Sequence, residues 1–215
     1  MTLATADSGP SRIDGRRLRS ERTRQAIILA YLELVARKPV MPTSAEIAER
    51  AGCSPRSIFE RFSDLDALSL ATADYAIAQG RAEAVARHLD GDRSTRIQSH
   101  VETRARVCEK WLPLWRIITT QDHVAGLRAR VELVRLANIE TIRLMYAPEL
   151  SGLSELDRAH SQIALAALTS FESWDQMRHC HGLSVEMAQD VWRSAIDRML
   201  PSEGLAGIGL PFDSG

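Results

Sequence analysis

The sequence has only two lysines, Lys38 and Lys110, among its 27 basic residues. Arginine therefore supplies nearly all of the positive charge, and its planar guanidinium group can bind phosphate through two hydrogen bonds. A GC-rich genome produces the same bias and is the better explanation. The scarcity of lysine alone therefore does not indicate nucleic-acid binding.

Cysteine is equally scarce, and long apolar runs are absent. Cys53, Cys108 and Cys180 are odd in number and have neither paired nor metal-type spacing, so we expect reduced thiols in a reducing compartment. No apolar run approaches the roughly 20 residues needed to cross a bilayer. The start MTLATADSGP lacks a basic segment followed by an apolar one. We therefore expect a cytoplasmic protein without a membrane partner.

Recognisable catalytic motifs are also missing. The sequence contains no phosphate-binding glycine loop, no nucleophile elbow, no HExxH motif and no carboxylate pair in a familiar context. We therefore expect neither an enzyme nor a bound cofactor. His179, Cys180 and His181 resemble metal ligands, with Asp175 four residues before His179. Successive helical residues point roughly 100° apart, however, so we expect no metal site.

The most informative stretch is TSAEIAERAGCSPRSIFERF, from Thr43 to Phe62. Thr43 can cap a helix, and Glu46 three residues later completes a capping box. Gly52 suits the left-handed residue that ends such a helix. Ser54 then offers a second N-cap, followed by a proline that fits the first helical position. The pattern predicts two short helices joined by a tight turn.

Apolar spacing supports the same interpretation. Ile47, Ala48 and Ala51 share one face of the first helix, and Ile58 and Phe62 form an i, i+4 pair on the second. The small alanines permit the close crossing of a helix-turn-helix unit. The alternative is an ordinary helix pair within an all-helical core.

Residues from about Arg22 to Tyr75 resemble the TetR family of bacterial transcriptional regulators. The matching positions are Thr43, Ile47, Ala48, Ala51, Gly52, Ser54, Phe59, Phe62 and Leu68. Two positions depart from the family pattern, which usually has Tyr at Phe59 and Lys at Leu65. Both departures remove phosphate partners, so other residues must supply contacts with the DNA backbone.

The resemblance implies a DNA-binding face on the second helix, and the arginines before the first helix separately predict a basic N-terminal arm that adds contacts. Arg56 and Ser57 stand in the first turn of the second helix, where helix-turn-helix proteins read base edges, whereas the arm is expected to reach phosphate or the minor groove. The predicted DNA-binding residues are Thr43, Ser44, Ser54, Pro55, Arg56, Ser57, Phe59, Arg61, Arg16, Arg17 and Arg19.

The charge distribution agrees with a DNA-binding face at this end. Between Arg12 and Arg61 there are 11 basic and 6 acidic residues, a net charge of +5, whereas the rest of the chain carries −6. The total is only −1. A protein with one nucleic-acid face should show this asymmetry, although a basic arm can also be merely solvated.

The sequence predicts an all-α fold of about nine helices, because no strand-like alternation is present. We expect an arm at 1–20, a helix-turn-helix domain at 21–63, a ligand-binding and dimerisation domain at 64–201, and a tail at 202–215. The expected helices are Glu21–Arg37, the two of the central motif, one from a cap at Ser63 or Asp64 to about Gly91, Ser94–Leu112, a short one near Leu114, His123–Tyr146, Ser154–His181 and Ser184–Leu200.

In TetR-like proteins the last two long helices pair with those of a second subunit. The residues that suit such a homodimer are Leu156, Ile163, Ala164, Ala167, Leu168, Phe171, Trp174, Val185, Ala188, Val191, Trp192, Ala195, Ile196 and Met199. A ligand cavity is predicted from large or adaptable side chains on the enclosing helices. These are Trp111, Trp115, His123, Met145, Phe171, Trp174 and Met177. The alternative is that they fill an ordinary core.

The resemblance therefore implies a repressor that a small apolar or aromatic ligand releases from a palindromic operator. Its partners would be double-stranded DNA, a second copy of the chain and an unidentified effector. Two other interpretations remain open. One is a helical small-molecule-binding protein or enzyme without operator affinity, and the other is a constitutive DNA-binding module without a ligand.

Overall fold

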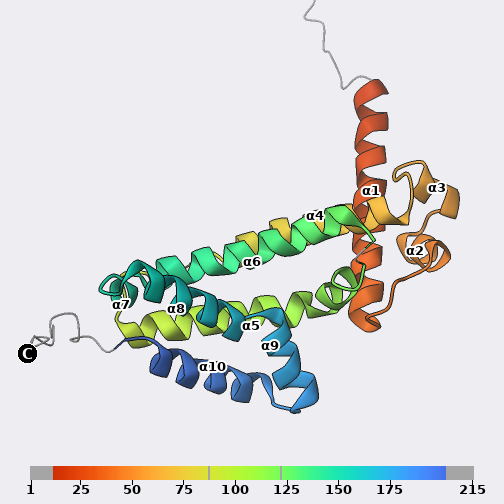
Figure 1. Ribbon diagram of the computed structural model, residues 1–215. Coiled ribbons are helices and arrows are strands. Elements are labelled where there is room, and N and C mark those ends of the chain that lie inside the picture. The colour runs from red at the N-terminus through yellow and green to blue at the C-terminus, as the bar shows by residue number, and fades with distance from the viewer. Residues whose placement is uncertain (1–11, 87, 122, 202–215) are drawn as a thin grey trace, which may run out of the picture.

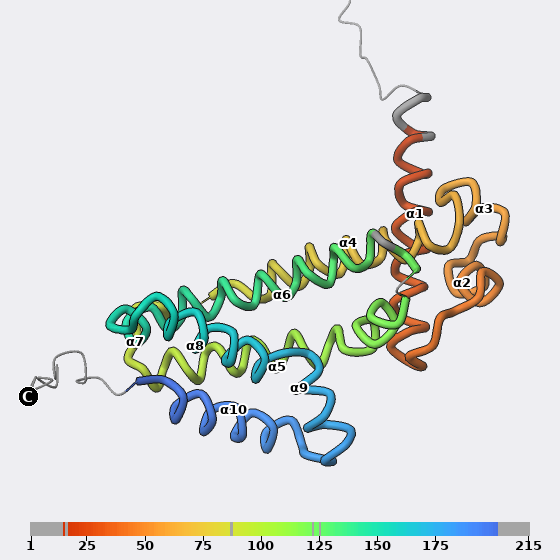
Figure 2. The backbone as a smooth tube through the Cα atoms, in the orientation of Figure 1, coloured from red at the N-terminus to blue at the C-terminus, as the bar shows by residue number. Residues whose placement is uncertain are grey.

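The computed structural model describes residues 12–86, 88–121 and 123–201, and their side chains except at 12–14, 16 and 125. The predicted tail at 202–215 and the first eleven residues of the predicted arm lie outside this part of the chain. Figures 1 and 2 show the path of the backbone.

Every regular element in the described part of the chain is helical, which confirms the all-α prediction. The helices are α1 (Arg12–Arg37), α2 (Ser44–Ala51), α3 (Pro55–Phe59), α4 (Leu65–Glu83), α5 (Arg93–Ile118), α6 (Ala125–Met145), α7 (Ala147–Leu150), α8 (Glu155–Leu168), α9 (Phe171–Asp175), the π-helical turn η1 (Gln176–Cys180) and α10 (Val185–Met199). None of these helices is both long enough and apolar enough to span a membrane.

Helices α1, α2 and α3 form a small unit at one end of the molecule. Figure 1 shows α2 and α3 beside α1, on the side facing away from the longer helices. The core of this unit contains Ile27, Tyr31, Ile47 and Ile58, each fully buried. Burial of these side chains from three short segments holds α3 in a fixed position relative to α1.

The longer helices form a second layer that starts at α1. α4, α5 and α6 run side by side away from α1, and α8 and α10 lie against α6 and α5. Arg96 and Glu149 form a buried ion pair where α5 meets α7 at the far end. Beside it, His100 Nδ1 and the Tyr146 hydroxyl lie 2.7 Å apart.

Helices α1 and α4 have different ends from those that the sequence predicts. α1 begins at Arg12 rather than Glu21, so the predicted arm is helical from Arg12 onward; arginine is a good helix former and no proline interrupts this stretch. α4 ends at Glu83 rather than near Gly91. Val85 and Leu89, which follow the end of the helix, are exposed.

The expected break at Pro113 is wrong, because α5 continues through it to Ile118. Proline costs roughly 3 kcal/mol in a helix interior. Trp111, Leu112, Leu114 and Trp115 on either side are all buried, and burying a large apolar side chain contributes about 1.5–3 kcal/mol. Packing therefore outweighs the cost of the missing N–H.

The expected helix Ser154–His181 is also wrong, because it is divided at Thr169 and Ser170. The Thr169 hydroxyl donates to the Leu165 carbonyl at 2.8 Å. Ser170 then caps α9 by accepting a hydrogen bond from the Ser173 N–H at 3.0 Å. A serine N-cap placed after a helix-ending turn starts a new helix in a new direction.

Candidate nucleic-acid interface and ligand cavity

The caps predicted for α2 are confirmed. The Thr43 N–H donates to Glu46 Oε2 at 2.8 Å, and the Glu46 N–H donates to Thr43 Oγ1 at 3.3 Å, which is the reciprocal pair of a capping box. The hydrogen bond from the Thr43 N–H is the largest cause that lowers the pKa of Glu46. Gly52 ends the helix with a φ of 65°, in the left-handed region.

The start of α3 is also capped as predicted. Ser54 Oγ accepts a hydrogen bond from the Ser57 N–H at 3.2 Å, and Pro55 occupies the first turn. The Ser57 hydroxyl lies 3.0 Å from the Ser54 hydroxyl. These local bonds fix the first turn of a helix only five residues long.

Arg56 and Phe59 project from α3 into solvent. The Arg56 side chain is 88% exposed, and its only partner in the described structure is Glu60, at 3.1 Å. Phe59, an aromatic side chain without an apolar cover, is also exposed. A loosely paired guanidinium group on the first turn of a helix can reach a base edge or a phosphate without breaking the fold.

Arg61 differs from the other predicted DNA-binding residues. Its side chain is only 20% exposed, and its Nη1 group donates to the Ser57 carbonyl at 2.9 Å. Arg61 therefore supports the C-terminal end of α3 through this donor, and its predicted contact with DNA stays a prediction. Thr43, Ser54 and Pro55 are exposed, and Ser44 is half-buried at the start of α2.

Arg17 and Arg19 lie on the projecting N-terminal turns of α1 and are exposed. Figure 1 shows this end of α1 extending beyond α2 and α3. A helix is about 10–12 Å wide with its side chains, whereas the minor groove is about 6 Å wide. Helical turns therefore cannot enter the groove as an extended arm does. The side chain of Arg16 lies outside the described side chains.

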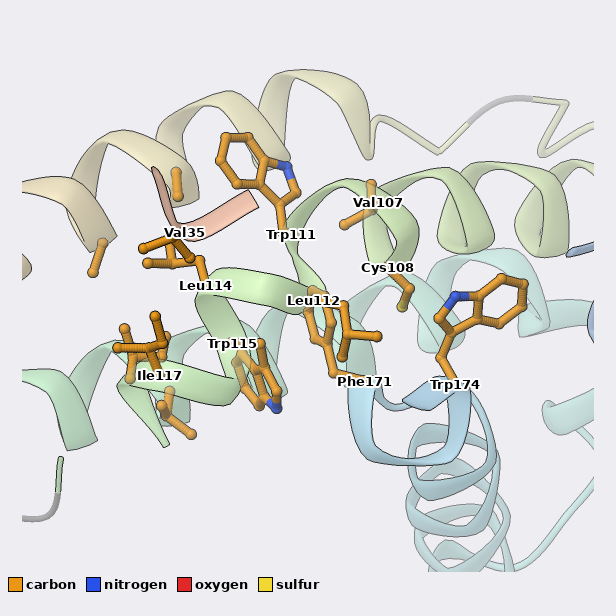
Figure 3. Close-up of a cluster of buried hydrophobic side chains, with 14 of the residues drawn as sticks. Val35, Val107, Cys108, Trp111, Leu112, Leu114, Trp115, Ile117, Phe171 and Trp174 are labelled. Atoms are coloured by element: carbon orange, nitrogen blue, oxygen red, sulfur yellow. The ribbon is translucent and has the colours of Figure 1, made fainter. Parts of the chain in front are cut away.

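The larger domain contains a mostly apolar cavity of about 110 Å³ between α4, α5 and α6. Small residues of α4 form one wall, namely Ala73, Ala76 and Gly80. Figure 3 shows Trp111 and Trp115 projecting from α5 in different directions, with Trp115 beside Phe171. The Trp115 and Phe171 rings stack with their centroids 4.6 Å apart. All three aromatic residues line the cavity.

The other predicted ligand-binding residues lie away from this cavity. Trp174 packs on Trp192, and its Nε1–H donates to Glu109 Oε1 at 2.7 Å. Met145 and Met177 are buried in the core without lining the cavity. His123 is exposed near α4, with Nε2 3.9 Å from Asp66 Oδ1. For Trp174, Met145 and Met177, size and spacing correctly indicated burial, but not which face of each helix borders the cavity.

Sequence reasoning missed the polar residues of the cavity. His100, Thr103, Arg104, Asn138 and Thr141 line it from α5 and α6. The small residues of α4 gave a signal that could have located this wall, because positions 73, 76 and 80 recur on one helix face.

His179, from the cluster that resembles metal ligands, contacts Asp175 on the same helical stretch. His179 Nδ1 lies 3.0 Å from Asp175 Oδ1, and Arg116 also pairs with Asp175. The guanidinium group of Arg116 is the main reason that the pKa of Asp175 is lowered. Within the described residues, no three His, Cys, Asp or Glu side chains are grouped to hold an ion.

Comparison with family profiles gives no match, and no curated protein matches the sequence. Several solved structures share the fold. One is a protein from Rhodococcus sp. assigned to the TetR family of transcriptional regulators, with 22% identity, a TM-score of 0.63, and coverage of 84% of this chain and 99% of that one.

Two further structures have similar scores. NalD, the secondary repressor of the MexAB-OprM multidrug efflux pump in Pseudomonas aeruginosa, is 19% identical with a TM-score of 0.57, over 86% of this chain and 98% of its own. The multidrug-binding protein EbrR, solved with imidazole, is 18% identical with a TM-score of 0.59, over 94% and 100%. From α1 to α10, this chain therefore has the fold of TetR-family transcriptional regulators.

Proposed function

We propose that this protein is a DNA-binding transcriptional regulator, and specifically a ligand-responsive repressor. The observation that carries the proposal is the capped α2–α3 pair, which presents Arg56 with an 88% exposed side chain. Helix-turn-helix proteins dock the first turn of the second helix in the major groove. Arg56 and Ser57 would meet base edges, and Arg17 and Arg19 would contact phosphates.

The protein acts as a homodimer in this proposal. On α8, Leu156 is 64% and Ile163 60% exposed, and Ala164 and Ala167 continue the same stripe. On α10, Met187 and Val191 are exposed in the same way. Exposed apolar residues on two helices that contact each other support a helix-bundle interface. A two-fold dimer presents two reading helices, which suits a palindromic operator.

The proposed ligand response uses α4 as the connecting helix. α4 packs on α1 at one end and lines the cavity farther along. A ligand that prefers one position of α4 can therefore change the distance between the two copies of α3 in a dimer. NalD is a repressor and EbrR is a multidrug-binding protein, and both share this fold.

The direct test is selection of bound duplexes from random DNA, followed by footprinting of the selected sequence. We expect a palindromic site whose half-sites are about one helical turn, or a multiple of it, apart. A variant carrying Arg56→Ala should lose this preference. Recovery of only random duplexes, with affinity independent of sequence, would contradict operator recognition. Such a result would favour a helical binding protein without an operator.

A further inference from the structure

The polar residues of the cavity gather at one end of it. His100, Thr103 and Arg104 lie near the N-terminal half of α5, and Asn138 and Thr141 lie opposite on α6. Trp111, Leu114 and Ile118 follow roughly two to four turns after Arg104 on α5, and their side chains are mostly apolar. The cavity is therefore polar at one end and mostly aromatic or aliphatic along the rest of its length, where the indole N–H groups of Trp111 and Trp115 also lack a partner among the described residues.

His100 contributes a buried nitrogen that lacks a partner. The residue is only 4% exposed, and its Nε2 makes no hydrogen bond to any described residue. Nδ1 lies 2.7 Å from the Tyr146 hydroxyl. Burial lowers the pKa of His100 to about 3, with a smaller effect from nearby Arg104, so the imidazole is neutral. When Tyr146 donates to Nδ1, the one imidazole proton stays on Nε2 and can be donated to a ligand.

Arg104 stands one helical turn from His100 and is held in a fixed orientation. Its Nε–H donates to the Thr169 carbonyl at 2.7 Å, and its Cζ lies 4.8 Å from the centre of the Phe171 ring. In the described structure, its two Nη groups form no ion pair or hydrogen bond. A fixed guanidinium group with free donors, next to an imidazole N–H, fits the two oxygens of a carboxylate.

The charges around the cavity point the same way. Among the described residues, the charged side chains that line it are Arg81 and Arg104, with no Asp or Glu beside them. The nearby carboxylates are already paired, Glu83 with Lys110 and Glu109 with Arg178. A cationic ligand would lose its hydration without gaining an opposite charge from the protein. An anionic ligand would instead gain the positive charge of an arginine.

We propose that the cavity selects an organic monocarboxylate with a slim aromatic or alkyl body, bound head-first against Arg104 and His100. The cavity of about 110 Å³ is narrow and partly open to solvent, so it favours a slim body whose far end can extend outward. The inference rests on the proposed function only in taking this cavity as the effector site. The carboxylate preference itself can be measured without DNA.

The test uses three probes with one body and different head groups: 4-phenylbutanoate, 4-phenylbutanol and 4-phenylbutylammonium. Binding to the ligand-free protein is followed by calorimetry and tryptophan fluorescence at pH 7, and repeated with octanoate, 1-octanol and octylammonium. We expect the acid to bind at least roughly tenfold more tightly than the alcohol or the amine of its own set. If the acid is not preferred in either set, or if nothing binds up to about 1 mM, the proposal is overturned.

Arg104→Gln should abolish the preference, weakening the acid by at least roughly tenfold while the alcohol changes little. The matched control is Arg106→Gln, which removes the same charge from an exposed position two residues along α5. Equal effects of the two variants would show that general charge, rather than a built site, attracts the acid. If Arg104→Gln does not fold, Arg104→Lys should still prefer the acid, and the wild-type comparison of head groups decides alone.

Failure of the proposed function is distinguishable from failure of this inference. An acid preference without any selected operator would leave the carboxylate site standing and reject the DNA-binding regulator. A selected operator without an acid preference would reject only the ligand class.

Discussion

The Tyr31 hydroxyl on α1 lies 3.3 Å from Ser69 Oγ on α4, in the buried contact between the small unit of α1, α2 and α3 and the longer helices. It also donates to Met41 Sδ at 3.1 Å. Burial is the largest cause that raises the pKa of Tyr31, so the phenol remains protonated and able to donate. This polar contact joins the helix that supports α3 to the helix that lines the cavity.

Tyr31→Phe should lower the free energy of unfolding by about 1 kcal/mol, because it removes a buried hydrogen bond. Ser69→Ala should cost less in the Tyr31→Phe background than in the wild type, since the two hydroxyls interact directly. Urea denaturation of the four proteins measures this coupling. Strictly additive effects would show that the two groups do not stabilise each other.

Arg56→Ala should cost roughly 1–3 kcal/mol on the selected operator and little on random duplexes. Arg106→Ala is a suitable control, because it removes an exposed arginine from α5, outside α3 and outside the proposed dimer helices. Binding isotherms on both duplexes at several salt concentrations make the comparison. Equal losses on both duplexes would place Arg56 on a phosphate and leave Ser57 to read the bases.

Replacing Arg17 and Arg19 together by alanine should weaken operator and random DNA alike. The slope of log affinity against log salt should become shallower by roughly one unit for each phosphate that the variant no longer neutralises. A loss of sequence preference in the Arg17 and Arg19 variant would assign base contacts to α1.

Arg61→Ala should instead lower the midpoint temperature of thermal unfolding, because the Arg61 side chain donates a hydrogen bond to the end of α3.

Ile163→Glu should convert a dimer into a monomer, because an unpaired charge within a buried interface is costly. Gln162→Glu places the same charge about 100° around the helix and is the matched control. Light scattering at micromolar concentration distinguishes the two states. A wild-type protein that is monomeric under these conditions would refute the dimer itself.

His100 should make the protein less stable in acid. Its pKa is about 3 in the folded chain, compared with about 6.5 when unfolded. Between these values the unfolded state binds more protons, so the free energy of unfolding falls as pH decreases, by up to about 1.4 kcal/mol per unit. Urea unfolding at pH 7, 6 and 5 should show a shallower fall for His100→Gln. An unchanged pH dependence would mean that other groups control acid unfolding.

The ends of α2 and α3 were predictable because their structure is set by residues close to them in the sequence. Thr43 with Glu46, Gly52, and Ser54 with Pro55 each satisfy backbone groups a few residues away. The bend at Thr169 and the passage through Pro113 depend on distant packing instead. A rule based on neighbouring residues cannot compare the free energy gained by burying Trp111 or Trp115 with the cost of the backbone hydrogen bond that Pro113 cannot make.

The cavity was predictable only in part for the same reason. Aromatic residues on helices indicated buried faces, yet Trp174 faces Trp192 and only Trp111, Trp115 and Phe171 reach the cavity. Arg104 and His100 had no distinguishing local signal, since an arginine and a histidine in a charged helix are usually exposed. Their roles arise from Thr169 and Tyr146, which are 65 and 46 residues away.

In the proposed carboxylate site, the small residues of α4 would allow the size and the charge of the accepted molecule to change independently. A methyl group added at Gly80 would lie 3.7 Å from Trp111 Nε1, an ordinary contact, so Gly80→Ala would shorten the apolar end without strain. Arg104 and His100, on α5, would keep their positions. Laboratory selection could therefore obtain a family of sensors that share one head-group preference and differ only in body length, by changing α4 alone.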